Sequence, residues 1–355
     1  MEHHHPGQRS PALSDTPIGA TIRSMIVKPI DPQAAARDLV SLWNGRLGDR
    51  FPLEERLYLQ QLSMERGECA LFGAFSDGAR AVGYLLAKTG PKAPQPCGHI
   101  SFVVADEAFS GRGIGNALFD AAESWLGLRG AGKIMLGGDT CHLFPGAPLD
   151  GASSSKALIA LLESRGYAAS GDEHDVAANL ANLDFAALRA RAPLAPGYSL
   201  RFYDPSMRPA LEAFFLADFP DRWYSDTMQA LDRGMPGRDL PVLVEDRSGD
   251  IVGFARIFDA SSPIIGPGIY WMRLMGEFPG ALGPIGVSAS VRGQGLGLGF
   301  LRACLEALAE RGAHFTAIDW TDLVDFYGKL GFRIWKSYRV FSRPMNTLNT
   351  WPADS

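Results

Sequence analysis

The stretch "GPIGVSASVRGQGLGLGFLRACLEALAERG", residues 283–312, decides the fold. Six glycines lie between Gly283 and Gly299, and an apolar pattern of helical period follows them. Glycine loses more conformational freedom on folding than any other residue, so a cluster at a helix start indicates that the backbone approaches something closely. A strand, a glycine turn and a helix N-terminus predict an anion site, because backbone N–H groups and the positive end of the helix dipole meet there.

A pyrophosphate is the natural ligand of such a turn, and three sequence patterns compete to describe it. The Walker A pattern G-x-x-x-x-G-K-[ST] does not occur in the chain. The dinucleotide pattern G-x-G-x-x-G fails, because it ends on Leu298 when it starts at Gly293 and on Phe300 when it starts at Gly295. The spacing that does occur is R-x-x-G-x-G, formed by Arg292, Gly295 and Gly297.

Length and charge limit the class of protein. A chain of 355 residues is long enough for two domains. The net charge is −5 and no basic stripe is present, so no nucleic-acid partner is expected. No run of about 18 apolar residues occurs, so no membrane span is expected. Residues 1–20 lack a secretory apolar core and predict a disordered tail, and the four cysteines form no C-x-x-C pair. We therefore expect a cytoplasmic protein without a metal site.

The chain contains a repeat. "AFSGRGIGNALF" (residues 108–119) resembles "SVRGQGLGLGFL" (290–301), so that Gly113 and Gly115 recur as Gly295 and Gly297. The segments 30–32, 82–84 and 129–131 recur in the same order, which predicts one unit used twice. The predicted boundaries are a first unit at 21–188, a linker at 189–197, a second unit at 198–345 and a tail at 346–355.

Each unit has helices first and strands afterwards. In the first unit the patterns predict helices at 33–43, 53–65 and 116–130 and strands at 68–76, 79–89, 99–105 and 133–138, with a hairpin turn at Asp77–Gly78. In the second unit they predict a hairpin at 241–259, strands at 282–288, 315–320 and 333–342, and helices at 298–312 and 323–330.

The turn "RGQGLG" (292–297), the long helix, the next strand and "FYGKLGF" (326–332) together resemble the GNAT acyltransferase superfamily. The resemblance covers nearly all of the chain after residue 21 and is more complete in the second half. It implies an α/β protein of two tandem GNAT-like acyltransferase domains, each a mixed, mostly antiparallel twisted sheet with helices on both faces. It also implies acetyl-CoA as cosubstrate, with its pyrophosphate on the turn and its thioester beside the amide of Val287. The residues that it implies for coenzyme binding are Val287, Arg292, Gly293, Gln294, Gly295, Leu296 and Gly297, with Gly113 and Gly115 in the first unit.

The resemblance also implies a general acid, the tyrosine before the K-x-G-[FY] turn, which is Tyr327. The first unit has Leu162 at that place and Ser110 where the second has Arg292, so we expect the second unit to be catalytic and the first to be silent. Two carboxylates are candidates for the general base. Asp319 ends the strand after the coenzyme helix, and Glu277 lies in the connection before the glycine-rich strand. A chain of water molecules is the alternative.

Two insertions bear on the acceptor. The connection at 266–283 is rich in aromatic residues and methionine and predicts an acceptor pocket, in which Tyr270 and Trp271 would face a sugar ring. The first unit carries an extra segment, Asp139–Ser155, whose Asp139, His142 and Phe144 line a polar pocket, contact the second unit or belong to a surface loop. Its part "GGDTCHLFPG" resembles a segment of bacterial glucosaminide N-acetyltransferases.

The expected activity is therefore acetyl transfer to a primary amine of a small polar molecule, with an amino sugar or glucosaminide as the acceptor. Two alternatives stay open. One is acetylation of a cysteinyl aminoglycoside, as in mycothiol synthase, and the other is a non-enzymatic acyl-CoA-binding or sensing protein. The sequence leaves a homodimer open and does not give the acceptor, because acceptor loops vary freely on one fold.

Overall fold

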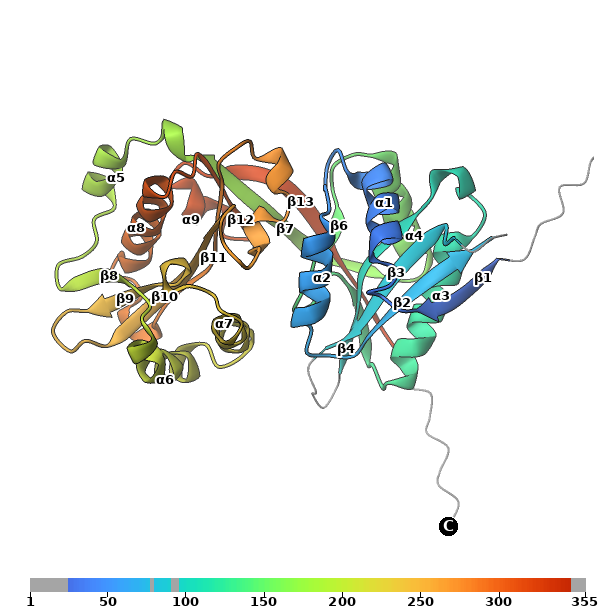
Figure 1. Ribbon diagram of the computed structural model, residues 1–355, viewed down its shortest axis with the longest axis horizontal. Coiled ribbons are helices and arrows are strands. Elements are labelled where there is room, and N and C mark those ends of the chain that lie inside the picture. Colours follow the sequence, from blue (N-terminus) through green and yellow to red (C-terminus); the bar gives the residue numbers. More distant parts are fainter. Residues whose placement is uncertain (1–24, 77–79, 91–95, 346–355) are drawn as a thin grey trace, which may run out of the picture.

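The computed structural model describes residues 25–76, 80–90 and 96–345. The predicted tails at 1–20 and 346–355 and the turn at Asp77–Gly78 lie outside the described residues. Two lobes, one for each predicted unit, lie side by side and share a single sheet (Figure 1).

The first lobe contains the predicted helices and strands, but it begins with a strand at Ile26–Ile30 where helices were expected first, and its three elements from Ala147 to Asn179 were not predicted. Its helices and strands are β1 (Ile26–Ile30), α1 (Ala36–Leu47), α2 (Glu55–Met64), β2 (Cys69–Phe75), β3 (Gly83–Thr89), β4 (Cys97–Ala105), α3 (Ile114–Leu128), β5 (Lys133–Leu136), β6 (Ala147–Pro148), α4 (Ser153–Ser164) and β7 (Ala168–Asn179). Side chains alternate across its strands: Leu86 and Phe102 pack with α1 and α2, whereas Leu85 and Ile100 pack with α3. Helices therefore cover both faces of the sheet, as predicted.

The second lobe repeats the plan. It contains α5 (Phe185–Arg191), β8 (Tyr198–Phe202), α6 (Arg208–Asp218), α7 (Arg222–Asp232), β9 (Pro241–Glu245), β10 (Ile251–Asp259), β11 (Pro279–Val287), α8 (Leu296–Glu310), β12 (Phe315–Thr321), α9 (Val324–Gly328) and β13 (Arg333–Pro344). The predicted linker at 189–197 begins inside α5. This helix forms because the side chain of Asp184 accepts a hydrogen bond from the amide of Ala187 at its N-terminus.

The two lobes exchange their last strands. The strand order is β1-β2-β3-β4-β5-β13-β7-β12-β11-β10-β9-β8, with β6 paired to β13. Thus β13, from the end of the second unit, pairs with β5 of the first, and β7, from the end of the first, pairs with β12 of the second. The exchanged strands also pair with each other and cross between the lobes (Figure 1). The boundaries drawn along the sequence stay a prediction, and the sheet itself does not divide at them.

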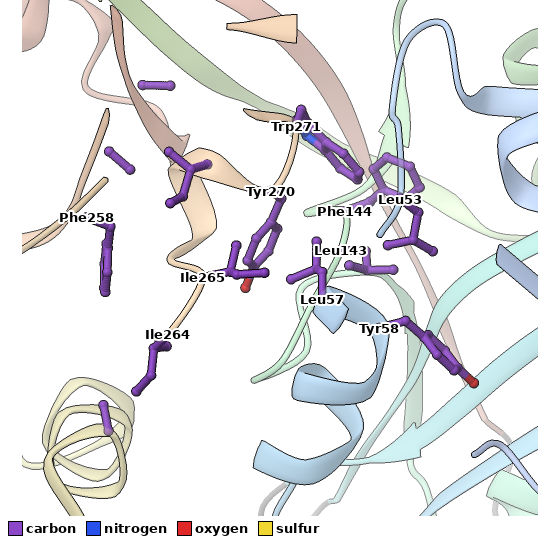
Figure 2. Packing of buried hydrophobic residues seen from close by; sticks show 14 of the residues in the cluster. Leu53, Leu57, Tyr58, Leu143, Phe144, Phe258, Ile264, Ile265, Tyr270 and Trp271 are labelled. Carbon is purple, nitrogen blue, oxygen red and sulfur yellow. The ribbon is translucent and has the colours of Figure 1, made fainter. Parts of the chain in front are cut away.

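The lobes also share a hydrophobic core. Phe144 stacks on Trp271, with ring centroids 5.6 Å apart (Figure 2). Phe51 meets the edge of Trp271, with ring centroids 5.3 Å apart. Trp271 is 3% exposed and Tyr270 is 7% exposed. The expectation that these two aromatic residues present their faces to a sugar is therefore wrong. Their insertion fills the junction between the lobes because α2 and the segment of Phe144 pack against it.

Candidate active site

The glycine turn before α8 has the geometry that an anion site needs. Gly293 and Gly295 have φ angles of 79° and 78°, in the left-handed region that favours glycine, and Gly295 is the N-cap of α8. A Cβ atom at either position would meet nothing within 4 Å. The glycines are thus required by the backbone, and the space in front of the amides is open. This is a cradle at a helix N-terminus that a phosphate would fit.

The side chain of Arg292 links this turn to the preceding strand. Its Nε donates a hydrogen bond to the carbonyl oxygen of Val287 at 3.1 Å, and its guanidinium lies over the ring of Phe219. Leu296 is buried and anchors the start of α8, while Gln294 is exposed beside the glycines. Gly297 lies inside the first turn of α8, opposite α9. The residues predicted to hold the coenzyme therefore gather at the end of β11.

β11, which leads to the glycine turn, separates from its neighbour β12. β11 and β12 pair in parallel from Pro279↔Phe315 to Ala281↔Ala317, and no pairing follows. A cavity of about 250 Å³ lies at this opening. Its walls come from β11, the end of β12, α7 and α9, so it passes through the opened sheet. The lining includes Gly283, Ile285, Asp319, Trp320, Tyr327, Arg222, Asp226 and Arg256.

Asp319, near the end of β12, and Tyr327, in α9, line the same cavity. Burial first, and then the charges of Asp319 and Asp322, raise the pKa of the Tyr327 phenol to about 12. The phenol therefore keeps its proton at neutral pH, as a general acid must. A Cβ atom on Gly283 would lie 3.5 Å from Asp319 Oδ1, so this carboxylate lies directly beside the separating strand.

His142 reaches this carboxylate from the first lobe. Its Nε2 lies 3.2 Å from Asp319 Oδ2, and its Nδ1 lies 3.3 Å from Arg222 Nη2. A guanidinium can only donate, so Nδ1 of His142 is the acceptor and Nε2 carries the hydrogen that is donated to Asp319. The insertion of the first unit thus contacts the second unit, which was one of the three readings of its sequence.

Asp139 and Phe144, the other candidates in the insertion, hold the segment in place. Asp139 Oδ2 accepts hydrogen bonds from Lys88 Nζ at 2.5 Å and from Ser101 Oγ at 2.9 Å. Burial acts to raise the pKa of Asp139, but the charges of Lys88 and His99 outweigh burial and hold it well below its usual range. Asp139 is therefore a buried ion-pair partner, and Phe144 belongs to the shared core.

Trp320, which lines the cavity, and Asp175, which bonds to the Trp320 backbone, were missed by sequence reasoning. Trp320 has a φ angle of 44°, which is unusual for a bulky residue. Asp175, on the exchanged strand β7, accepts hydrogen bonds from the Trp320 amide at 3.2 Å and from the Tyr338 hydroxyl at 2.7 Å. Burial, and then the charge of Asp319, raise the pKa of Asp175 to about 7. No local pattern shows this residue, because its position depends on the strand exchange.

A model of the acetyltransferase (GNAT) family matches the sequence twice, at residues 36–144 and 205–332. The chain belongs to this family. A search of curated proteins finds no match. The two matched regions include the glycine turns at Gly113 and Gly295.

Similar solved structures support the tandem fold. The glucosamine N-acetyltransferase region of a fungal multi-domain GH3 β-N-acetylglucosaminidase has a TM-score of 0.81 and 23% identity over 94% of this chain. The chain spans 40% of that longer protein. A tandem GNAT protein from the clavulanic acid pathway has a TM-score of 0.66, with 16% identity over 90% of this chain and 98% of its own. A GNAT protein from Sphaerobacter thermophilus has a TM-score of 0.62, with 18% identity over 90% of this chain and 95% of its own.

The first GNAT unit has its own opening. β4 and β5 pair from Cys97↔Lys133 to Ile100↔Leu136 and then separate. Gly113 is the left-handed N-cap of α3, with a φ of 80°. A cavity of about 590 Å³ extends from the turn at Ser110, Gly113 and Gly115 along β4 to α4. The cavity of this unit is therefore larger than the cavity of the second.

The register shows what the first GNAT unit lacks. Cys97↔Lys133 corresponds to Pro279↔Phe315, so Gly137 takes the place of Asp319 and Gly138 the place of Trp320. Leu162 takes the place of Tyr327 and is fully buried.

Glu277 is not brought to the cavity. It is exposed just before β11, at the end of this strand that pairs with β12, whereas the cavity lies where the two strands have separated. Asp319 is thus the candidate base that the cavity retains. Among the described residues no helix is long and apolar enough to cross a membrane, and no three His, Cys, Asp or Glu side chains group as metal ligands.

Proposed function

We propose that the second GNAT unit transfers an acetyl group from acetyl-CoA to a primary amine of a small polar acceptor, and that this acceptor is an amino sugar. The observation that carries the proposal is the joint position of Asp319 and Tyr327 in one cavity, at the point where β11 leaves β12. A base and an acid on opposite sides of an opened GNAT sheet are the two groups that amide formation needs.

The chain offers a fitting site for the coenzyme. The open cradle at Gly293 and Gly295 would hold the pyrophosphate, and Arg292 would add a positive charge beside it. Acetyl-CoA, when bound, supplies the acetyl thioester. The separating half of β11, which ends at Val287, leads from the cradle to the cavity.

The residues of the cavity have separate proton-transfer roles. Asp319 accepts a proton from the acceptor's ammonium group, so that the nitrogen has a free lone pair. His142 donates to the other oxygen of this carboxylate and fixes its orientation. Tyr327 gives its phenolic proton to the departing sulfur. Gly283 leaves room beside Asp319 that a side chain would occupy.

Charged side chains at the walls of the cavity favour a sugar-like acceptor. Arg222, Asp226 and Asp319 offer charged hydrogen-bonding groups at its walls. An amine beside electron-withdrawing hydroxyl groups is also less basic than lysine, so a carboxylate is a sufficient base. A further support is the glucosamine N-acetyltransferase region among the similar structures, which shares the tandem fold.

The first GNAT unit, in this proposal, holds the coenzyme without transferring its acetyl group. The cavity of 590 Å³ has the glycine turn, but Gly137 and Leu162 cannot exchange a proton. This favours a structural or sensing role for the first unit beside a catalytic second unit.

The direct test is an acceptor screen that follows the release of free coenzyme A thiol. Glucosamine, a chitobiose-type amine, an aminoglycoside, a cysteinyl aminoglycoside, lysine and a short peptide are compared at equal concentration. We expect the highest kcat/KM with an amino sugar, and loss of the signal in Asp319→Asn. A preference for lysine or the peptide would contradict the acceptor class, and no turnover with any amine would contradict the enzymatic proposal.

A further inference from the structure

Arg256 lies at a β-bulge beside the active-site cavity. The register between β10 and β11 passes from Ala255↔Ile285 to Ile257↔Leu282, so Arg256 stands opposite two residues, Gly283 and Pro284. A bulge of this kind re-aims a side chain and is common next to active sites. Arg256 lines both the cavity of 250 Å³ and an adjoining cavity of about 40 Å³ that extends toward the first lobe.

The guanidinium of Arg256 is buried without a counter-ion. The residue is 7% exposed, and within the described parts of the chain it makes no hydrogen bond or ion pair; its Nε is buried and unpartnered. Burial lowers the pKa of Arg256, and the charges of Asp226 and, to a smaller extent, Asp319 oppose this only in part. Buried charges in proteins are ordinarily paired with an opposite charge, whereas Arg256 has only the ring of Phe258, whose centroid lies 5.9 Å from the guanidinium carbon.

The nearest carboxylates are already engaged. Asp226 accepts from Arg66 at 2.8 Å and from Arg222 at 3.1 Å. Asp319 accepts from His142 at 3.2 Å. Of the two arginines that line the cavity, Arg256 is therefore the one that no carboxylate of the described residues contacts directly.

The first GNAT unit shows that the fold does not need an arginine here. Gly83 pairs with Ala105 in one unit as Gly253 pairs with Val287 in the other, so Leu86 occupies the position of Arg256. Leu86 is 3% exposed and packs in the core. The equivalent strand position thus holds a leucine in the first unit, which lacks the candidate acid and base. It holds an arginine in the second unit, which has both.

We propose that Arg256 binds an anionic group of the acceptor, a carboxylate or a phosphate, so that the acceptor carries an amine and an anion on one small molecule. This inference rests on the proposed acetyl transfer and narrows its substrate class. A guanidinium presents parallel N–H donors that match the two oxygens of a carboxylate or phosphate. Such a pair would restore the missing charge partner.

The position of Arg256 favours contact with the acceptor rather than with the coenzyme. Arg222 and Asp226, which line the cavity with it, belong to α7, whereas the coenzyme turn leads into α8 on the opposite face of the sheet. The cavity volume of 250 Å³ lies below the range of about 300–1,000 Å³ that is usual for drug-sized ligands, so the acceptor is small. The amine would lie toward Asp319 and the anion toward Arg256.

The test compares acceptors that share one amine and differ in the anion. The probes are glucosamine, glucosamine 6-phosphate and 2-amino-2-deoxyglucuronate. Each is assayed with wild type, Arg256→Leu, which reproduces the first unit, Arg256→Lys, and Arg247→Leu, an exposed arginine on the β9–β10 turn as matched control. Calorimetry with glucosamine 6-phosphate measures binding apart from turnover, and thermal melting shows that each variant is folded.

We expect kcat/KM to be about tenfold or more higher for at least one anionic probe than for glucosamine, as one charge-assisted pair provides. The better probe identifies phosphate or carboxylate. This ratio should fall toward one in Arg256→Leu, be partly kept in Arg256→Lys and stay at the wild-type value in Arg247→Leu. Acetylation of glucosamine with no advantage for either anion, or an equal fall for all three probes in Arg256→Leu, would overturn the inference and leave the acetyltransferase proposal standing. Arg256-dependent binding of glucosamine 6-phosphate without any acetyl transfer would support the anion site and count against the proposed function.

Discussion

The two GNAT units share their backbone and differ in a few side chains. Both have a left-handed glycine at the helix N-cap, Gly113 and Gly295, and both have a parallel strand pair that separates after a few residues. At the opening the second unit has Asp319, Trp320, Tyr327 and Arg256, and the first has Gly137, Gly138, Leu162 and Leu86. The comparison teaches that the fold can keep the glycine turn and the strand opening while the candidate acid and base are absent.

The comparison also shows why the second unit depends on the first. Gly138 has a φ of 67°, and Trp320 adopts the same region with a φ of 44°, although a side chain there costs about 1–2 kcal/mol. Asp175, on a strand that the first unit contributes, accepts a hydrogen bond from the Trp320 amide. His142, also from the first unit, orients Asp319. The candidate active site is therefore composite.

Tyr327→Phe should lower turnover more than the substitutions at His142 and Asp175. Removing a general acid typically lowers the rate about 10²–10⁴-fold. We expect a fall of this size in kcat, with the coenzyme affinity from calorimetry nearly unchanged. Tyr203→Phe, in a partly exposed tyrosine of the same unit outside the cavity lining, is the control. A loss below threefold would show that another group protonates the sulfur and that Leu162 is not what silences the first unit.

His142→Phe should have a smaller effect, because it removes the orientation of Asp319 but leaves the carboxylate. A misplaced reacting group can cost up to about 10²-fold in rate. We expect kcat to fall within this limit, with a shifted pH–rate profile and unchanged coenzyme affinity. His142→Gln, which keeps a donor near Asp319, should recover part of the rate. An unaltered pH profile together with lowered thermal stability would instead assign His142 a purely structural role.

Asp175→Asn should change the pH dependence of stability. The pKa of Asp175 is raised to about 7 from 3.8, so in the window between them the unfolded chain has lost a proton that the folded protein keeps. Wild-type stability therefore falls as pH rises from about 4 to about 7, by on the order of 4 kcal/mol from this group. The variant should lack this slope in denaturant unfolding at several pH values, whereas Asp246→Asn, an exposed control, should keep it. Parallel slopes in wild type and Asp175→Asn would contradict the assignment.

The local features of this fold could be predicted from the sequence, and the long-range ones could not. The turn at Gly293 and Gly295 is specified by residues that are adjacent in the chain, so its motif indicated both the helix start and the family. The exchange of β7 and β13 depends on pairing between distant strands and leaves no local signal. Trp271 shows the same limit, because an aromatic residue that fills an interface has the same sequence pattern as one that lines a pocket.

The internal repeat contains an indication that Arg256 is unusual, and the sequence analysis did not use it. The repeat aligned Val82–Tyr84 with Val252–Phe254, and two positions further along the same strand the alignment places Leu86 against Arg256. A charged residue against a core leucine in one internal repeat indicates a site-specific role. Its bulge and its missing counter-ion required the structure.

The central claim, that the two GNAT units hold coenzyme alike but only the second transfers, is tested most directly by paired glycine substitutions. Gly113→Glu and Gly295→Glu each place a bulky negative side chain in one left-handed turn. Calorimetry with acetyl-CoA and steady-state turnover are measured on both, with circular dichroism to confirm the fold. We predict two coenzyme molecules per chain for wild type and one for each variant, with turnover close to wild type in Gly113→Glu and undetectable in Gly295→Glu. Loss of activity in a natively folded Gly113→Glu, with activity kept in Gly295→Glu, would contradict the account and move the chemistry to the first unit.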